Sequence, residues 1–192
     1  MPTGTALRDA REQLFDAAER VLLRDGSSAL TSRAVTTEAG CAKGVLHRHF
    51  ADFDAFLADL VLDRIARIDS RAAALRDAAG TRTVADNLAQ VLPEVFGPVG
   101  VAIVALVTSR DGLRLRLREL RGAGIPIMAE ATDMIAAYLV AERELGRLAA
   151  DIDVDTLAPM LVGAGHLLFA DRHGAPPSAE AVRRVVTAVI RP

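Results

Sequence analysis

Four side chains that can carry positive charge lie close together in the segment CAKGVLHRHF: Lys43, His47, Arg48 and His49. An ammonium or guanidinium group can bind a phosphate, or the acceptor atoms of a guanine edge in the major groove of DNA. The commoner alternative is that such charges face solvent. Lys43 is the only lysine beside 22 arginines. Lysine is a compact charge on a thin stem, which suits a narrow site better than the planar fork of arginine does.

The residue types needed for catalysis or metal binding do not occur at useful spacings. There is no Ser/His/Asp arrangement, no H-E-x-x-H, no cysteine pair and no Gly-rich phosphate loop. Histidines 47, 49, 166 and 173 do not alternate with carboxylates at metal-ligand spacing. We therefore predict that the chain is not an enzyme and that it holds neither a metal nor a cofactor.

Composition favours a water-exposed protein with one sizeable core. The chain has 192 residues, 51% of them hydrophobic, with a formal net charge of −2 and one cysteine. It shows no uninterrupted apolar run of membrane-spanning length and no apolar leader near its N-terminus. These features predict no membrane partner and a cytoplasmic location.

The pattern of apolar residues is helical almost throughout, so the predicted fold class is all-α. The first predicted helix runs from Leu7 to Arg24, and Thr31 and Asp52 are predicted N-caps of later helices. Further helices are predicted at 44–49, 84–96, 99–108, 126–144 and 155–170. Ser178 is the predicted cap of a last helix that ends at Ile190. Pro126 is expected to begin its helix because proline suits the first helical position.

Residues 31–50 read as two short helices joined by a Gly-containing turn, which is a helix-turn-helix pattern. The packing of this motif asks for a small residue, a turn glycine and an aliphatic residue, and Thr36, Gly40 and Leu46 stand at these places. Val35, Cys41 and Phe50 are expected to be buried with them. The alternative is an ordinary corner between two helices of an all-α protein.

The longer segment ALTSRAVTTEAGCAKGVLHRHFADFDAFLADLV closely resembles the DNA-binding segment of the tetracycline-repressor (TetR) family of bacterial transcription regulators. The matching positions are Leu30, Thr31, Ala39, Gly40, Gly44, Leu46, His49 and Phe50. This resemblance covers about the first 65 residues. It implies an N-terminal three-helix helix-turn-helix domain, residues 1–50, and a C-terminal helical bundle for effector binding and dimerisation, residues 51–192.

Four positions depart from the family pattern. Thr36 stands where alanine is preferred, and Ala42 replaces the usual Ser or Thr cap of the recognition helix. His47 replaces a tyrosine and Phe53 a lysine, both of which commonly meet phosphates. These changes are expected to weaken the positioning of the domain on DNA.

The resemblance implies a homodimer that binds a palindromic double-stranded DNA operator and is released from it by a small-molecule effector. The candidate DNA-binding residues are Thr31, Ser32, Arg33, Ala42, Lys43, Gly44, His47 and Arg48. The candidate effector-binding residues are Phe96, Met128, Met134, Tyr138, His166 and Phe169. Because aromatic residues are scarce, an apolar or amphipathic effector is expected. Most members of the family repress transcription, so the resemblance implies a repressor. The alternative is an all-α structural or protein-interaction module of the same fold without DNA binding.

One further arginine-rich segment, RDGLRLRLRELR from 110 to 121, is open to two interpretations. Leu113, Leu117 and Leu120 share one face of a helix, so an ordinary amphipathic helix is the favoured interpretation. The other is a gate for an anionic ligand.

Overall fold

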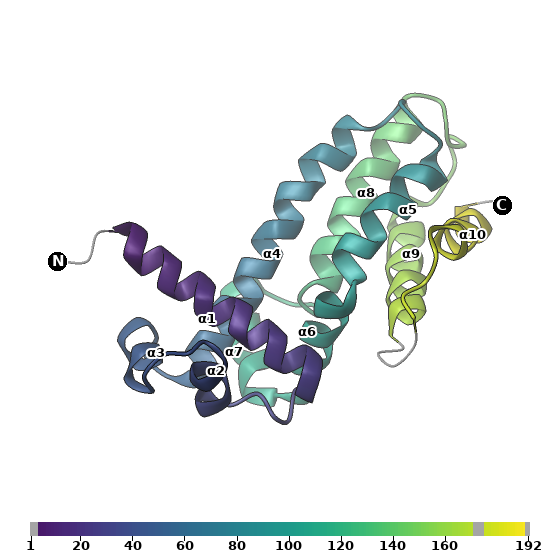
Figure 1. The fold of residues 1–192 in the computed structure, drawn as a ribbon. Helices are drawn as coiled ribbons and strands as arrows, with labels where there is room; N and C mark the ends of the chain where they lie inside the picture. The colour runs from purple at the N-terminus through teal and green to yellow at the C-terminus, as the bar shows by residue number, and fades with distance from the viewer. Residues whose placement is uncertain (1–3, 171–174, 191–192) are drawn as a thin grey trace. The chain divides into compact units, whose positions relative to one another are not determined.

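The computed structural model describes residues 4–170 and 175–190, and side chains from residue 10 onward (Figure 1). Within these residues the chain forms ten helices and no strand, which confirms the all-α prediction. The helices are α1 (Gly4–Asp25), α2 (Ser32–Glu38), α3 (Gly44–His49), α4 (Phe53–Asp77), α5 (Val84–Phe96), α6 (Pro98–Ser109), α7 (Asp111–Arg121), α8 (Met128–Glu144), α9 (Val154–Phe169) and α10 (Ala179–Ile190).

Side-chain oxygens accept otherwise unpaired backbone N–H groups at the starts of several helices, and the caps Thr31, Asp52 and Ser178 were predicted. The N–H of Ala34 donates to Thr31 at 3.1 Å, and that of Ala55 donates to Asp52 at 2.6 Å. The N–H groups of Thr156 and Ala181 donate to Asp153 and Ser178, each at 3.2 Å. The cap of α4 also affects Asp52 itself. The backbone N–H of Ala55, with a smaller contribution from Arg116, holds the pKa of the Asp52 carboxyl below its usual value.

The predicted start of α8 is wrong by two residues. The helix begins at Met128, and Pro126 precedes it as part of a turn. Ile127 has a φ of 75°, a left-handed conformation that a β-branched residue rarely adopts. Its N–H donates to Oε2 of Glu130 at 2.8 Å, so the carboxylate one turn ahead stabilises this entry into the helix.

The described chain divides into two compact units. The first combines residues up to 63 with residues 102–123, and the second combines residues 64–101 with residues from 124 onward. Helices α4 and α6 each contribute to both units. The prediction of a domain boundary after residue 50 stays a prediction.

The core of the first unit is built on an aromatic cluster. Phe15, Phe50 and Phe56 lie with ring centroids 5.0–6.0 Å apart, and Phe53 stacks on Phe56 at 5.6 Å. The guanidinium of Arg11 lies 4.7 Å from the centre of the Phe50 ring. Four of the six phenylalanines of the chain therefore join α1, the end of α3 and the start of α4.

In the second unit, α9 packs against α8, α10 and α5. The chain bends by 54° between α5 and α6. At this bend Gly97 and Gly100 are both buried, and a Cβ on Gly100 would lie 1.9 Å from the carbonyl oxygen of Val95. Only glycine fits at position 100 without moving the backbone.

Among the described residues, no single helix is both long and apolar enough to cross a membrane. The bent pair α5 and α6 meets that criterion only when its two members are taken together.

Candidate nucleic-acid interface and ligand pocket

Helices α2 and α3 form the predicted helix-turn-helix packing. Thr36 and Val35 of α2 and Leu46 of α3 are buried, and Gly40 in the turn has a φ of 65°. The Thr36 hydroxyl donates to the carbonyl oxygen of Ser32 at 3.0 Å, which allows a polar residue at this tight position. The expected burial of Cys41 is wrong: it is half-exposed, because it lies in the turn itself.

Glu38, the last residue of α2, fastens this helix to α1. Its two carboxylate oxygens accept hydrogen bonds from Arg20 and Arg24, each at 2.8 Å. These bonds, led by the one from Arg20, hold the pKa of Glu38 below its usual value. A carboxylate at a helix C-terminus opposes the helix dipole, so the two arginines offset an unfavourable position.

The predicted DNA-binding side chains face outward. Thr31, Arg33, Ala42, Lys43, Gly44, His47 and Arg48 are exposed, and Ser32 is half-buried. Helix α3 buries only Leu46 of its six residues. Most of these side chains are therefore accessible from outside and are not part of the core.

Lys43 occupies the N-cap of α3 and makes no side-chain cap hydrogen bond. A positive charge at a helix N-terminus opposes the helix dipole, and Ala42 beside it offers no hydroxyl. Lys43 therefore does nothing for the stability of α3. Its ammonium group is available to an outside partner.

The arginine-rich helix α7 is structural at its N-terminal end. Arg110 Nη2 donates to the carbonyl oxygen of Leu30 at 2.9 Å, and Nη1 lies 3.7 Å from Oδ1 of Asp54. Arg116 lies 3.4 Å from Oδ2 of Asp52. These contacts, within the first unit, tie α7 to the start of α4 and to the residue before the N-cap of α2.

The amphipathic interpretation of α7 is correct in part. Leu113 and Leu117 are buried, as expected. Leu120, on the same face, is 57% exposed. The helix ends one residue later, at Arg121.

Phe53, a departure from the family pattern, is half-buried at the start of α4. It stacks on Phe56, and the guanidinium of Arg110 lies 5.6 Å from its ring centre. A lysine at this position would be too polar for that stack. The sequence change therefore exchanges a surface charge for a contact that anchors α4.

The predicted effector-binding residues divide into two groups. Phe96, Met134 and Tyr138 are buried in the core, whereas Met128, His166 and Phe169 are half-buried. Among them, Phe96 and His166 meet edge to face, with ring centroids 5.8 Å apart. Burial lowers the pKa of His166 below its usual value.

Tyr138 belongs to a buried polar network that the sequence did not reveal. Its hydroxyl donates to Oε1 of Glu142 at 2.5 Å and accepts from Nδ2 of Asn87 at 3.0 Å. Glu142 has no exposed surface, and its other oxygen pairs with Arg147 at 3.2 Å and accepts from the N–H of Gly80 at 3.4 Å. The network joins α5, α8 and the loops that follow α4 and α8.

Burial, helped by the bond to Glu142, raises the pKa of Tyr138 well above its usual range. In the unfolded chain it should ionise near pH 10. The stability that the neutral phenol contributes is present below pH 10 and is lost as the pH rises further.

Because this is the only tyrosine and there is no tryptophan, ultraviolet absorbance reports the ionisation of Tyr138 alone. We expect no tyrosinate at pH 10 in the folded protein and a titration near pH 10 in urea, and a native titration near pH 10 would contradict this.

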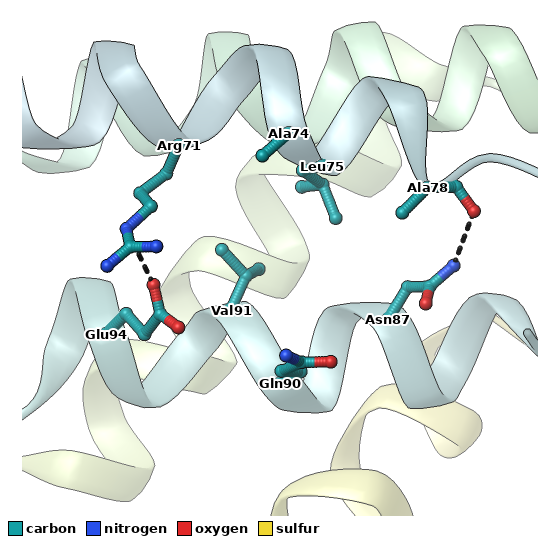
Figure 2. A pocket seen from close by; sticks show the side chains of 8 residues that line it. All are labelled: Arg71, Ala74, Leu75, Ala78, Asn87, Gln90, Val91 and Glu94. Carbon is teal, nitrogen blue, oxygen red and sulfur yellow. Dashed lines mark hydrogen bonds and ion pairs between the residues drawn. The ribbon is translucent and has the colours of Figure 1, made fainter.

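A pocket opens between α4 and α5 (Figure 2). Its cavity is about 120 Å³, and its lining residues are Arg71, Ala74, Leu75, Ala78, Asn87, Gln90, Val91 and Glu94. On each helix they recur with the spacing i, i+3, i+4, i+7, so two stripes face each other. One end carries the ion pair between Arg71 and Glu94 at 3.0 Å, and the other the bond from Asn87 Nδ2 to the carbonyl oxygen of Ala78 at 3.1 Å.

None of the eight lining residues was among the predicted effector-binding residues, which were chosen for size and aromatic character. The facing stripes are visible in the sequence as small and polar residues at helical spacing. The sequence does not show which residues of one stripe lie opposite which residues of the other. Among the described residues, no three His, Cys, Asp or Glu side chains gather where they could hold a metal ion.

Comparison with known proteins supports this geometry. Residues 14–60 match the model of the family described as bacterial regulatory proteins, tetR family. The matched segment spans most of α1, all of α2 and α3, and the start of α4. No curated protein sequence matches the chain significantly.

Solved structures share the fold over nearly the whole chain. The structure of a member of the TetR family from Streptomyces coelicolor A3 is 27% identical, with a TM-score of 0.65, and covers 95% of this chain and 99% of that one. The transcriptional regulator FadR from Bacillus subtilis in complex with stearoyl-CoA is 19% identical, with a TM-score of 0.69, and the match covers 93% of this chain and 97% of FadR. The multidrug binding protein EbrR complexed with malachite green is 23% identical, with a TM-score of 0.61, and the match covers 94% of this chain and 98% of EbrR.

Proposed function

Because the chain is a member of the TetR family of regulators by its matched N-terminal segment and its fold, we propose that it is a repressor released from a palindromic operator by a small molecule. Regulators of this family bind DNA and are not enzymes, so the chain is a transcriptional regulator. The repression, the palindrome, the effector and a cytoplasmic location are the proposed parts.

The exposed face of α3 carries the proposal. Lys43 is the N-cap of α3, and His47 and Arg48 are exposed on this helix, in which only Leu46 is fully buried. The turn before α3 has the geometry of a helix-turn-helix. In this motif the N-terminal residues of the second helix contact base edges in the major groove. The exposed hydroxyl of Thr31 and the side chain of Arg33 at the start of α2 are suited to neighbouring phosphates.

Two of the structurally similar proteins support an amphipathic effector. FadR is bound to stearoyl-CoA and EbrR to malachite green, and both ligands combine a large apolar part with charge. The mechanism that follows is a population shift, in which the effector stabilises a conformation that fits the operator poorly. The effector must bind the two conformations with different affinity, or nothing shifts.

A palindromic operator requires a symmetric dimer, for which α9 offers a surface. Met160 and Leu167 are 54% and 77% exposed, and Gly163 between them lies on the same exposed stripe. The neighbouring apolar side chains Leu157 and Leu161 are already buried in the protomer. We therefore assign the exposed stripe of α9, with the adjoining half-buried residues of α10, to contact with a second copy.

Gly163→Glu is expected to convert the dimer into a monomer, because it places a carboxylate in the centre of this stripe. Sedimentation at micromolar concentration measures the effect. Ala137→Glu, which adds the same charge on an exposed position of α8, should leave the dimer intact. A wild-type monomer at that concentration would contradict the assignment.

Lys43→Ala is expected to weaken operator binding by about 1–3 kcal/mol while the melting temperature stays nearly unchanged. If Lys43 meets a phosphate, specific and random DNA lose affinity alike, and the salt slope falls by about one per half-site. If it meets a base, the loss concentrates on the operator. Arg118→Ala, an exposed charge on α7, is the control. Unchanged affinity of Lys43→Ala for every sequence at low salt would remove Lys43 from the interface.

The proposed function is tested by a gel shift with the DNA upstream of the protein's own gene, with and without candidate effectors. A shifted band that an effector releases supports the proposal. Absence of any sequence-specific shift would favour the alternative, a module of this fold that has no DNA-binding activity.

A further inference from the structure

We propose that the groove between α4 and α5 binds a short amphipathic carboxylic acid, with the carboxylate on Arg71 and the apolar chain between the two helices. This assignment rests on the proposed function, since it names the effector class and its site. None of the six residues that aromatic and sulfur-containing character singled out lines this groove.

The groove has two parts that meet at the ion pair of Arg71 with Glu94. One is the 120 Å³ cavity of Figure 2, with Leu75 and Val91 as its apolar walls. The other, of about 320 Å³, is lined by Arg64, Arg67, Ile68, Ser70, Arg71, Ala74, Glu94 and Val95. Arg71, Ala74 and Glu94 line both parts, so the parts adjoin across this pair.

The charges of the groove favour an anion. Arg64, Arg67 and Arg71 line it with Glu94 as the one carboxylate among its lining residues. Arg64 Nη2 donates to the backbone oxygen of Glu94 at 3.0 Å.

The position of Glu94 identifies a carboxylate as the matching head group. Its side chain already pairs with Arg71 at 3.0 Å, and both side chains are largely exposed, at 40% and 60%. An exposed pair contributes little stability, so an external carboxylate can take its place. Arginine binds carboxylates through two parallel N–H···O bonds, which gives the site its preference.

The smaller cavity, shown in Figure 2, sets the length of the ligand's apolar tail. Its 120 Å³ correspond to roughly four water volumes, or about four methylene-sized groups. Ala74 and Ala78 leave this space open on α4, and Asn87 closes the end, because its Nδ2 is held by Ala78 and Tyr138. Hexanoate therefore matches the site better than acetate does.

Calorimetric titration of the full-length dimer with hexanoate, hexan-1-ol and hexylamine tests the head group. Hexanoate is expected to bind at least tenfold more tightly than either analogue. Arg71→Gln should weaken hexanoate at least tenfold, and Arg76→Gln, an exposed arginine of α4 outside the groove, should not. Glu94→Gln removes the internal competitor and should tighten hexanoate severalfold, a gain that misfolding cannot produce.

Two neighbouring alanines test the place of the tail. Ala74 and Ala73 are both exposed on α4, but only Ala74 lines the groove. Ala74→Leu should abolish hexanoate binding with an unchanged melting temperature, and Ala73→Leu should bind as the wild type does. Equal binding by Ala74→Leu, tighter binding of hexylamine, or no binding of any of the three ligands would overturn the assignment.

Failure of this inference and failure of the proposed function are distinguishable in the same samples. If a different ligand releases the operator and Ala74→Leu leaves that release unchanged, the regulator stands and the groove assignment falls. If hexanoate binds in an Ala74-dependent way and no DNA is bound, the groove stands and the regulator falls.

Discussion

Replacing Glu142 with alanine is expected to lower the free energy of unfolding by about 3 kcal/mol. The substitution removes the acceptor of the Tyr138 hydroxyl and of the Gly80 N–H, and leaves Arg147 without its carboxylate. Removing one partner of a buried pair costs roughly 3–5 kcal/mol, and Arg147 is 29% exposed, so solvent can reach it and the lower figure applies. Urea unfolding followed by circular dichroism measures the change.

Tyr138→Phe provides the graded comparison. It removes one hydroxyl, while Glu142 keeps Arg147 and Gly80 and Asn87 keeps the carbonyl oxygen of Ala78. A loss of about 1 kcal/mol is expected. If both variants lose the same amount, the carboxylate contributes nothing beyond its bond to the tyrosine and the network interpretation is wrong.

Replacing Gly100 with alanine is expected to lower the free energy of unfolding by about 3 kcal/mol, although glycine-to-alanine changes inside helices usually stabilise. The new Cβ would overlap the carbonyl oxygen of Val95, a backbone atom that cannot turn aside. The chain must then open the bend between α5 and α6. The melting temperature of the purified protein reports the effect.

Gly112→Ala is the matched control, in the first turn of α7. A Cβ there would meet its nearest neighbour, Oδ2 of Asp54, at an ordinary 3.6 Å. Its melting temperature should be unchanged or slightly raised. An equal loss in both variants would show that the close contact at Gly100 does not set the effect.

Local signals in the sequence were sufficient for much of the fold. The predicted limits 44–49 and 84–96 agree with α3 and α5, because a glycine turn precedes the first and a threonine cap precedes the second. The start of α8 was missed because Glu130 caps Ile127 from within the helix, which outweighs the preference of Pro126 for a first turn. Periodicity places Leu120 on the same face as Leu113 and Leu117, but it does not show that Leu120 is 57% exposed.

The candidate sites were predictable to different degrees. The candidate DNA-binding residues follow from one continuous segment, whose spacing fixes a known local packing. The groove between α4 and α5 does not, because Arg71 and Glu94 meet through the register of two helices. Nor does the partnership of Asn87 with Tyr138, since the residues are 51 positions apart and an amide gives no periodic signal.

The difference between the buried and the exposed residues of α3 has an evolutionary consequence. Of its six residues only Leu46 is fully buried, whereas His47, Arg48 and the N-cap residue Lys43 are exposed. Substitutions at Lys43, His47 and Arg48 therefore leave the folding free energy nearly untouched while changing what the helix meets outside. Selection can explore new binding preferences at these positions without compensating changes elsewhere, and duplicated copies of such a gene can diverge in target before they diverge in fold.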